Sequence, residues 1–110
     1  MKELTKIEET VLLAIWRLEN NAYGVEVRRR VEEVTGRAVN YSTLYATLEQ
    51  MVRKGLINKQ FGEPTAVRGG KRKVFFHPTT LGLDALKRAF ERQKSLWAGI
   101  NDEAFQRGRL

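Results

Sequence analysis

Residues 40–61 read NYSTLYATLEQMVRKGLINKQF, and within them a helical pattern gives way to a strand pattern. Asn40 is a favourable N-cap residue, and Gly55 interrupts the helical spacing directly after two cations suited to a helix C-terminus. The apolar residues of the helical part recur on one face, at Leu44, Leu48 and Met51. Residues 56–61 then alternate, imperfectly, between apolar and polar side chains. The stretch therefore predicts a helix followed at once by a β-strand.

Two more helices are expected upstream, in residues 5–20 and 24–35, because apolar residues recur there in steps of three and four. The first helix carries Ile7, Val11, Ile15 and Leu18 on this face, and the second carries Val27, Val31 and Val34, with Arg28 and Glu32 toward solvent. Gly36 is suited to end the second helix, since glycine readily adopts the left-handed conformation of the C′ position. Only residues 37–39 then separate the second helix from the third.

A second strand is expected at residues 73–77, which are rich in Val and Phe. The connection between the strands holds Gly62, Pro64, Gly69 and Gly70, and it is longer than a tight hairpin needs. The predicted order is three helices, a β-hairpin and a last helix. Two helices joined by a short turn and followed by a β-hairpin form a winged helix-turn-helix. The predicted fold class is therefore mainly α with a small β-hairpin.

The last helix is predicted to be long and to begin at Thr79 or Thr80. Its apolar positions follow in steps of four and three, a heptad seam with one polar member: Leu86, Phe90, Gln93, Trp97, Ile100 and Ala104. We expect dimerisation through the first five of these residues. Residues 1–78 would then form the DNA-binding winged helix-turn-helix, and residues 79–110 the dimerisation helix of the same compact unit.

The composition restricts the partners of the protein. The chain has 110 residues, with 20 Lys and Arg against 13 Asp and Glu, and a net charge of +7 that favours a polyanionic partner. It contains no Cys, which excludes disulfides and thiolate metal sites. The longest apolar run, residues 11–16, is far shorter than the ~20 residues of a membrane helix. We therefore expect a cytoplasmic protein with no membrane partner.

Residues 67–76, VRGGKRKVFF, place two glycines and four cations directly before or at the second strand. A Walker phosphate loop is excluded, because Arg72 replaces its hydroxyl residue and a strand follows instead of a helix. A flexible basic loop can instead follow the phosphate backbone of a duplex, and residues 53–73 hold seven cations and one acid. A hairpin kept soluble by its charge is the alternative. The candidate DNA contacts of this wing are Arg68, Lys71, Arg72 and Lys73.

The third helix presents small and hydroxylated side chains on its predicted outer side. Hydroxyl groups donate to phosphates, glutamine can pair with adenine, and the N–H groups of a first helical turn can bind anions. The candidate DNA contacts of this helix are Tyr41, Ser42, Thr43, Thr47 and Gln50. An ordinary capping turn is the alternative for Ser42 and Thr43. Tyr45 borders the buried stripe, so we expect it to pack within the protein.

Enzymatic chemistry finds no support in the sequence. The single histidine, His77, ends a predicted strand and has no partners for a catalytic triad or a metal cluster. The adjacent glutamates at residues 8–9 and 32–33 point to different sides of their helices, unlike a pair of catalytic carboxylates. We therefore predict no catalytic residue, no metal and no cofactor.

Several short motifs resemble those of the PadR family of transcriptional regulators. YGVEV at residues 23–27 resembles the YGYEI-type segment of that family, and YSTLYATL at residues 41–48 resembles its GTLYPLL segment. KGLI at residues 54–57 and the basic GGKRKVF at residues 69–75 resemble the family's KGLI and its wing ending in RKYY. Thr79 and Gly82 match the LTxxG opening of the last helix. The resemblance covers residues 5–90 in order.

This resemblance implies a homodimeric winged-helix repressor, or a related regulator, with its last helix as the dimer contact. Two-fold symmetry would require a partly palindromic operator. Carried over by position, the contacts to double-stranded DNA would be Tyr41, Ser42, Thr43 and Thr47 of the third helix and Arg68, Lys71 and Arg72 of the wing. The sequence departs from the family at Ser42, where glycine is usual, at Ala46, where proline is frequent, and at Pro78, where leucine is usual.

The resemblance also implies a small aromatic effector bound at the dimer core, where Trp16 and Trp97 would stack on it. Ordinary packing is the alternative for both tryptophans, and the sequence favours that alternative. For the chain as a whole, the alternative function is a winged-helix protein-interaction or RNA-binding module without operator binding. Charge alone does not distinguish these partners, because each can be a polyanion.

Overall fold

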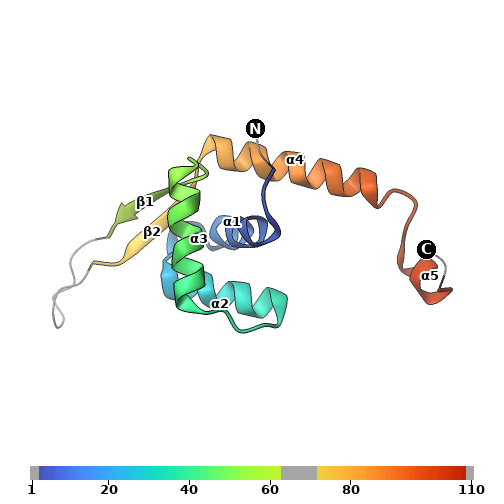
Figure 1. Cartoon of the computed structure of the whole chain (residues 1–110), viewed down its shortest axis with the longest axis horizontal. Helices are drawn as coiled ribbons and strands as arrows, with labels where there is room; N and C mark the ends of the chain where they lie inside the picture. Colours follow the sequence, from blue (N-terminus) through green and yellow to red (C-terminus); the bar gives the residue numbers. More distant parts are fainter. Residues whose placement is uncertain (1–2, 63–71, 109–110) are drawn as a thin grey trace.

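The computed structural model describes residues 3–62 and 72–108 and has the expected order of elements (Figure 1). Three helices precede a β-hairpin, and a long helix follows it, so the winged helix-turn-helix fold is confirmed. The elements are α1 (Lys6–Leu18), the 3₁₀ turn η1 (Glu19–Asn21), α2 (Gly24–Thr35), α3 (Tyr41–Arg53), β1 (Ile57–Phe61), β2 (Val74–Pro78), α4 (Thr80–Leu96) and α5 (Asp102–Gln106).

Capping residues lie at several helix ends, and the sequence indicated three of them, Asn40, Gly36 and Thr79. Thr5 and Glu8 form a reciprocal capping box at the start of α1, and Asn40 caps α3. Gly36 ends α2 in the left-handed conformation, with φ of 70°. Thr79 caps α4 through a hydrogen bond that its hydroxyl accepts from the Gly82 amide. Local capping chemistry thus marks the start of α1, α3 and α4 and the end of α2.

The hydrophobic core is built around α1, which contacts α2, α3, α4 and β2. Its side chains Val11, Leu12 and Ile15 are fully buried. The other helices and the hairpin contribute Val27, Val31, Leu44, Leu48, Met51, Leu56, Ile57, Phe76, Ala85 and Leu86. Val34 was expected in this core, but it is 61% exposed, because an open cavity lies between it and α1 where Val31 is packed.

The base of the wing is anchored to the start of α2. Strands β1 and β2 pair antiparallel, from Ile57 opposite Pro78 to Phe61 opposite Val74. The Phe76 amide donates to the Ala22 carbonyl at 2.8 Å, and Tyr23 forms an isolated bridge with Phe75. The hairpin is therefore held to the helical body as well as to itself.

The turn after α3 and the start of α4 form one close contact. The Thr79 hydroxyl donates to the Gly55 carbonyl at 2.6 Å, and the Thr79 amide donates to the Leu56 carbonyl at 3.1 Å. A Cβ at Gly82 would lie 2.2 Å from the Leu56 carbonyl oxygen, so only glycine allows this approach. The motifs at residues 54–57 and 79–82 thus meet in space.

The C-terminal helix is shorter than the heptad pattern predicts. Helix α4 ends at Leu96, Trp97 is its C-cap, and Gly99 has a φ of +82° before the short helix α5 begins. Trp97 and Ile100 are therefore not continuous with Leu86 and Phe90 on one helix face. A turn at residues 97–99, with Gly99 in the left-handed conformation, interrupts the helix, and the regular spacing of apolar residues does not register it. Figure 1 shows α4 extending beyond the remaining helices, with α5 set apart at its end.

Candidate nucleic-acid interface

Helix α3 has one buried and one exposed face. Leu44, Thr47, Leu48 and Met51 are buried against the core, and the exposed positions include Tyr41, Ser42, Ala46, Glu49 and Gln50. The side chains at the centre of the exposed face are small, which permits close approach to a groove of nucleic acid. Of the predicted contacts, Tyr41, Ser42, Thr43 and Gln50 are exposed.

Thr47 does not belong to this exposed face. It is only 8% exposed, and its hydroxyl donates to the Thr43 carbonyl at 2.9 Å within the helix. The residue lies three positions after Leu44 and four before Met51, so helical periodicity places it in the buried stripe. The expectation that Thr47 lies on the outward side of the helix is therefore wrong.

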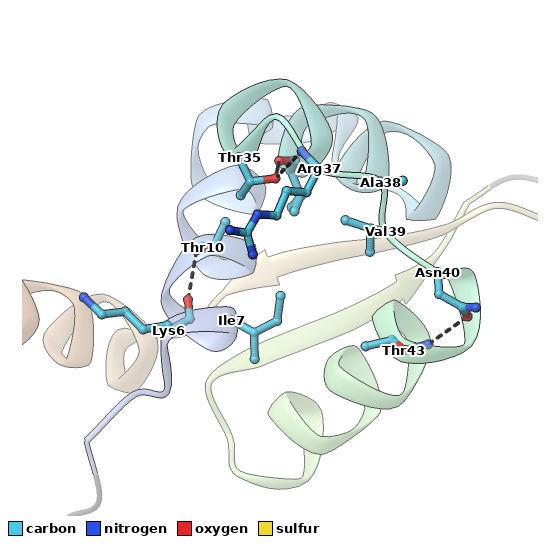
Figure 2. Close-up of a pocket in the computed structure, with 10 residues that line it drawn as sticks. Lys6, Ile7, Thr10, Thr35, Arg37, Ala38, Val39, Asn40 and Thr43 are labelled. Carbon is cyan, nitrogen blue, oxygen red and sulfur yellow. Dashed lines mark hydrogen bonds between the residues drawn. The ribbon is translucent and has the colours of Figure 1, made fainter.

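The first turn of α3 is already capped within the protein. Oδ1 of Asn40 accepts hydrogen bonds from the amides of Ser42 at 2.7 Å and Thr43 at 3.4 Å, the second of which Figure 2 shows. These two N–H groups are thus not free to bind a phosphate, contrary to the expectation from the helix N-terminus. A contact from this turn must come from side chains such as Tyr41 and Ser42.

Arg28 and Glu32 of α2 hold the turn that leads into α3. Nε of Arg28 donates to the Val39 carbonyl at 2.8 Å, and Oε2 of Glu32 accepts from the Val39 amide at 2.7 Å. The two side chains also lie 3.6 Å apart as an ion pair. Both were expected to face solvent, but they are half-buried and fix the direction of α3.

A row of aromatic rings continues from Arg28 along α3. The Arg28 guanidinium lies 4.1 Å from the centroid of the Tyr41 ring, and Tyr41 stacks on Tyr45 with a centroid distance of 5.9 Å. A Cβ at Gly24 would lie 2.1 Å from the Tyr45 hydroxyl oxygen, so Tyr45 packs on the first turn of α2. Tyr45 is nevertheless 44% exposed, beside the candidate DNA-facing residues.

Several cations of the basic segment have partners within the protein. Lys54 bonds Glu8 at 2.6 Å, Lys59 pairs with Glu49 at 3.3 Å, and Nζ of Lys73 lies 4.3 Å from the Tyr23 ring centroid. Arg72 is exposed at the start of the second half of the wing. The predicted contacts Arg68 and Lys71 lie outside the described residues. The described part of the wing therefore offers Arg72 and Lys73, while Lys59 offsets an acid on the exposed face of α3.

The two tryptophans lie in different surroundings. Trp16 is 53% exposed and lines a cavity of about 550 Å³ between α1 and α4, together with Leu13, Leu83, Leu86 and Phe90. Trp97 is not among the lining residues, and its ring centroid lies 5.8 Å from that of Phe105. Of the predicted dimer contacts, Leu86 is buried in the core of its own chain, whereas Phe90, Gln93, Trp97 and Ile100 are exposed.

His77 lies in β2 opposite Asn58, as expected for a strand residue. Among residues 3–62 and 72–108, no group of three or more His, Cys, Asp or Glu is placed to hold a metal ion. Within that same part of the chain, no helix is long and apolar enough to cross a membrane.

Comparison with known proteins agrees with this winged architecture. The sequence profile of the transcriptional regulator PadR-like family matches residues 11–88. The chain belongs to this family. Proteins of this family are transcription regulators and not enzymes. The comparison with curated proteins finds no match.

Solved structures share the fold of this PadR-like chain along most of its length. RosR of H. salinarum is 26% identical, with 96% of this chain and 87% of that one covered and a TM-score of 0.68. A PadR family transcription regulator from Clostridium difficile is 25% identical, with 90% and 95% covered and a TM-score of 0.61. A transcriptional regulator from Clostridium thermocellum, at 21% identity and a TM-score of 0.67, covers 86% of this chain and 89% of its own and shares the fold.

The roles of three residues, Glu49, Arg28 and Glu32, were not identified from the sequence. Glu49 lies seven residues after Ser42, so helical periodicity could have placed it on the same exposed face. Its pairing with Lys59 depends on how β1 folds back beside α3, which no local pattern contains. Arg28 and Glu32 have the four-residue spacing of a surface ion pair, and only the position of Val39 shows that they bind the turn.

Proposed function

We propose that this PadR-like protein binds a partly palindromic operator as a homodimer in the cytoplasm and represses transcription. The observation that carries the proposal is the exposed face of α3, anchored by Arg28 and Glu32 and flanked by a basic wing. Tyr41, Ser42, Thr43 and Gln50 would contact the operator from α3. Arg72 and Lys73, with Arg68 and Lys71, would contact its phosphates from the wing.

The exposed apolar side chains of α4 support the homodimer. Phe90 and Leu96 are 59% and 76% exposed, and Trp97 follows at the end of the helix. Because α4 projects beyond the core of its own chain (Figure 1), a second copy is the simplest cover for these side chains. A two-fold dimer places two recognition helices about 34 Å apart, so that each would contact one half of the operator.

Release by a small aromatic effector is the remaining part of the proposal. The cavity beside Trp16 is supported as its site, because Leu13, Leu83 and Phe90 provide apolar walls around one face of the indole. Titration of aromatic compounds would be followed by tryptophan fluorescence in Trp97→Phe and Trp16→Phe. A saturable change in Trp97→Phe that is absent in Trp16→Phe is expected. No saturable change in either variant would remove the effector from the proposal.

The main test is fluorescence anisotropy with duplex DNA from the promoter region, over a series of salt concentrations. Arg72→Gln should weaken binding to all duplexes alike and reduce the salt slope by about 0.9, the value of one phosphate contact. Gln50→Ala should instead change the preference among operator variants. Sedimentation should show a dimer. A monomer that binds RNA or an acidic protein but no duplex DNA would contradict the proposal.

A further inference from the structure

A second cavity lies between α1 and α2, away from the exposed face of α3. Its volume is about 300 Å³, within the range of small-molecule sites. Leu13, Ala14, Val31 and Val34 form apolar walls, and Arg17 and Arg30 contribute two guanidinium groups. Among the residues that the structure describes, no aspartate or glutamate lines it. The cavity thus combines an apolar interior with positive charge that none of these lining residues neutralises.

Arg30 brings a buried hydrogen-bond donor to this cavity. Its Nε is buried and has no hydrogen-bond partner among the described residues. Neither Arg30 nor Arg17 forms an ion pair with any residue in the described part of the chain. The nearby carboxylate of Glu26 is 3.3 Å from Arg29 instead. A buried donor without an acceptor is unfavourable, so an acceptor supplied by a ligand would be stabilising here.

The exposed apolar side chains of this cavity indicate that the rest of the ligand is apolar. Val34 is 61% exposed and Leu13 is 39% exposed, although both belong to the apolar side of their helices. An apolar group lying between them would remove this surface from water. A guanidinium recognises a carboxylate through paired hydrogen bonds, and the apolar walls disfavour a bare inorganic anion.

We propose that the cavity between α1 and α2 binds a small carboxylate with an apolar body. The carboxylate is held by Arg30 and Arg17, and the apolar body lies against Leu13 and Val34. Thr10 also lines this cavity, and its hydroxyl donates to the Lys6 carbonyl at 2.8 Å. This site differs in chemistry from the cavity beside Trp16, because its two arginines select a ligand that carries a negative charge as well as an apolar surface.

The site adjoins the turn that orients α3. Thr10 and Val31 also line a larger groove of about 680 Å³ that reaches Arg37, Val39 and Thr43. Figure 2 shows the Arg37 side chain extending over this groove from the end of α2. A ligand between α1 and α2 would therefore contact the helix whose Arg28 and Glu32 hold the turn.

The test uses octanoate as the probe and octylammonium and acetate as controls, with the full chain. Amide chemical shifts should show saturable binding of octanoate at the Leu13, Arg30 and Val34 positions. Affinity should fall by about tenfold in Arg30→Gln, as expected for loss of a charge-assisted pair. Arg107→Gln is the matched control, since Arg107, the residue that follows α5, pairs with Glu103 at 2.9 Å and does not line this cavity, and the variant should bind like the wild type.

Val34→Glu provides a second variant that keeps both arginines. Because residue 34 is largely exposed, the substitution should leave the fold intact. Its carboxylate, four residues after Arg30, should occupy the arginines and abolish octanoate binding. Equal binding of octylammonium, wild-type affinity in Arg30→Gln, or identical shifts with acetate would each overturn the proposal. None of these outcomes depends on DNA binding, so they leave the proposed operator function untouched.

Discussion

Nζ of Lys54 lies 2.6 Å from Oε2 of Glu8, although 46 positions separate the two residues in the sequence. The contact joins the start of α1 to the end of α3, and Oε1 of Glu8 also accepts from the Thr5 amide at 3.0 Å. Burial raises the pKa of Glu8, but the hydrogen bonds from Lys54 and Thr5 outweigh burial and lower the pKa below its ordinary value. One carboxylate thus caps α1 and fixes α3.

The first prediction concerns acid stability. Because the folded pKa of Glu8 is lowered, the ionised carboxylate stabilises the fold above the ordinary pKa of 4.5 that the group has when unfolded. This stabilisation should be lost as the pH falls through the lower folded pKa. Urea unfolding of the wild type and Glu8→Gln between pH 7 and pH 3 should show the two curves converging in acid. Parallel curves would contradict the assignment to Glu8.

Removing Lys54 and removing Glu8 should lower the free energy of unfolding by different amounts. Lys54→Met leaves the Glu8 carboxylate only 2% exposed and without its cation, which should lower the free energy of unfolding by about 2–3 kcal/mol at pH 7. Glu8→Gln leaves Lys54, whose side chain is 36% exposed, free to reach water, so a loss of about 1–2 kcal/mol is expected. The reverse order, measured by urea unfolding at pH 7, would show that an unpaired carboxylate at residue 8 costs less than an unpaired ammonium at residue 54.

The second prediction contrasts two glycines that approach other groups closely. In Gly82→Ala the new Cβ would meet the Leu56 backbone carbonyl, which cannot move without shifting the turn after α3. We expect a loss of about 3 kcal/mol in the free energy of unfolding. Gly24→Ala meets only the end of the rotatable Tyr45 side chain, so its loss should stay within about 1 kcal/mol. Similar losses for both variants in urea unfolding would be inconsistent with this geometry.

The third prediction separates the buried and exposed faces of α3. Thr47→Val removes a hydroxyl that bonds only the Thr43 carbonyl, so operator affinity should change by no more than about twofold. Ser42→Glu places a carboxylate on the exposed face, where repulsion from phosphates should weaken binding by about tenfold or more. Anisotropy with operator DNA would measure both. A larger effect from Thr47→Val would mean that α3 meets DNA through its other side.

The fourth prediction concerns the acid on that exposed face. Glu49→Gln removes a negative charge and releases Lys59, which the carboxylate holds at 3.3 Å. Binding to duplex DNA should become about two- to fivefold tighter, as expected for an exposed pair. The salt slope should steepen by up to about 0.9 if Lys59 then contacts a phosphate. Glu103→Gln on α5 is the control, and an equal effect there would point to net charge instead of position.

The local sequence was enough to predict the type and the approximate ends of most helices and strands. The predicted second helix, residues 24–35, coincides with α2, and Asn40, Gly36 and Thr79 act at the helix ends where they were expected. Caps and apolar periodicity operate over a few residues, so they can be recognised without knowing what packs nearby. The order of elements then sufficed for the winged helix-turn-helix, and the joint order of the short motifs between residues 23 and 82 sufficed for the family.

The environment of each side chain depended on the tertiary structure. Thr47 is buried and Val34 exposed because the packing of α1 and its neighbours, rather than residue type, decides which helix faces are covered. The pairs Glu8–Lys54 and Glu49–Lys59 form because folding brings distant segments within hydrogen-bond range. Periodicity also could not reveal that α4 stops at Leu96, since the turn at residues 97–99 leaves the spacing of apolar residues unchanged. Sequence thus determined which elements form, whereas long-range packing decided which of their side chains can reach a partner.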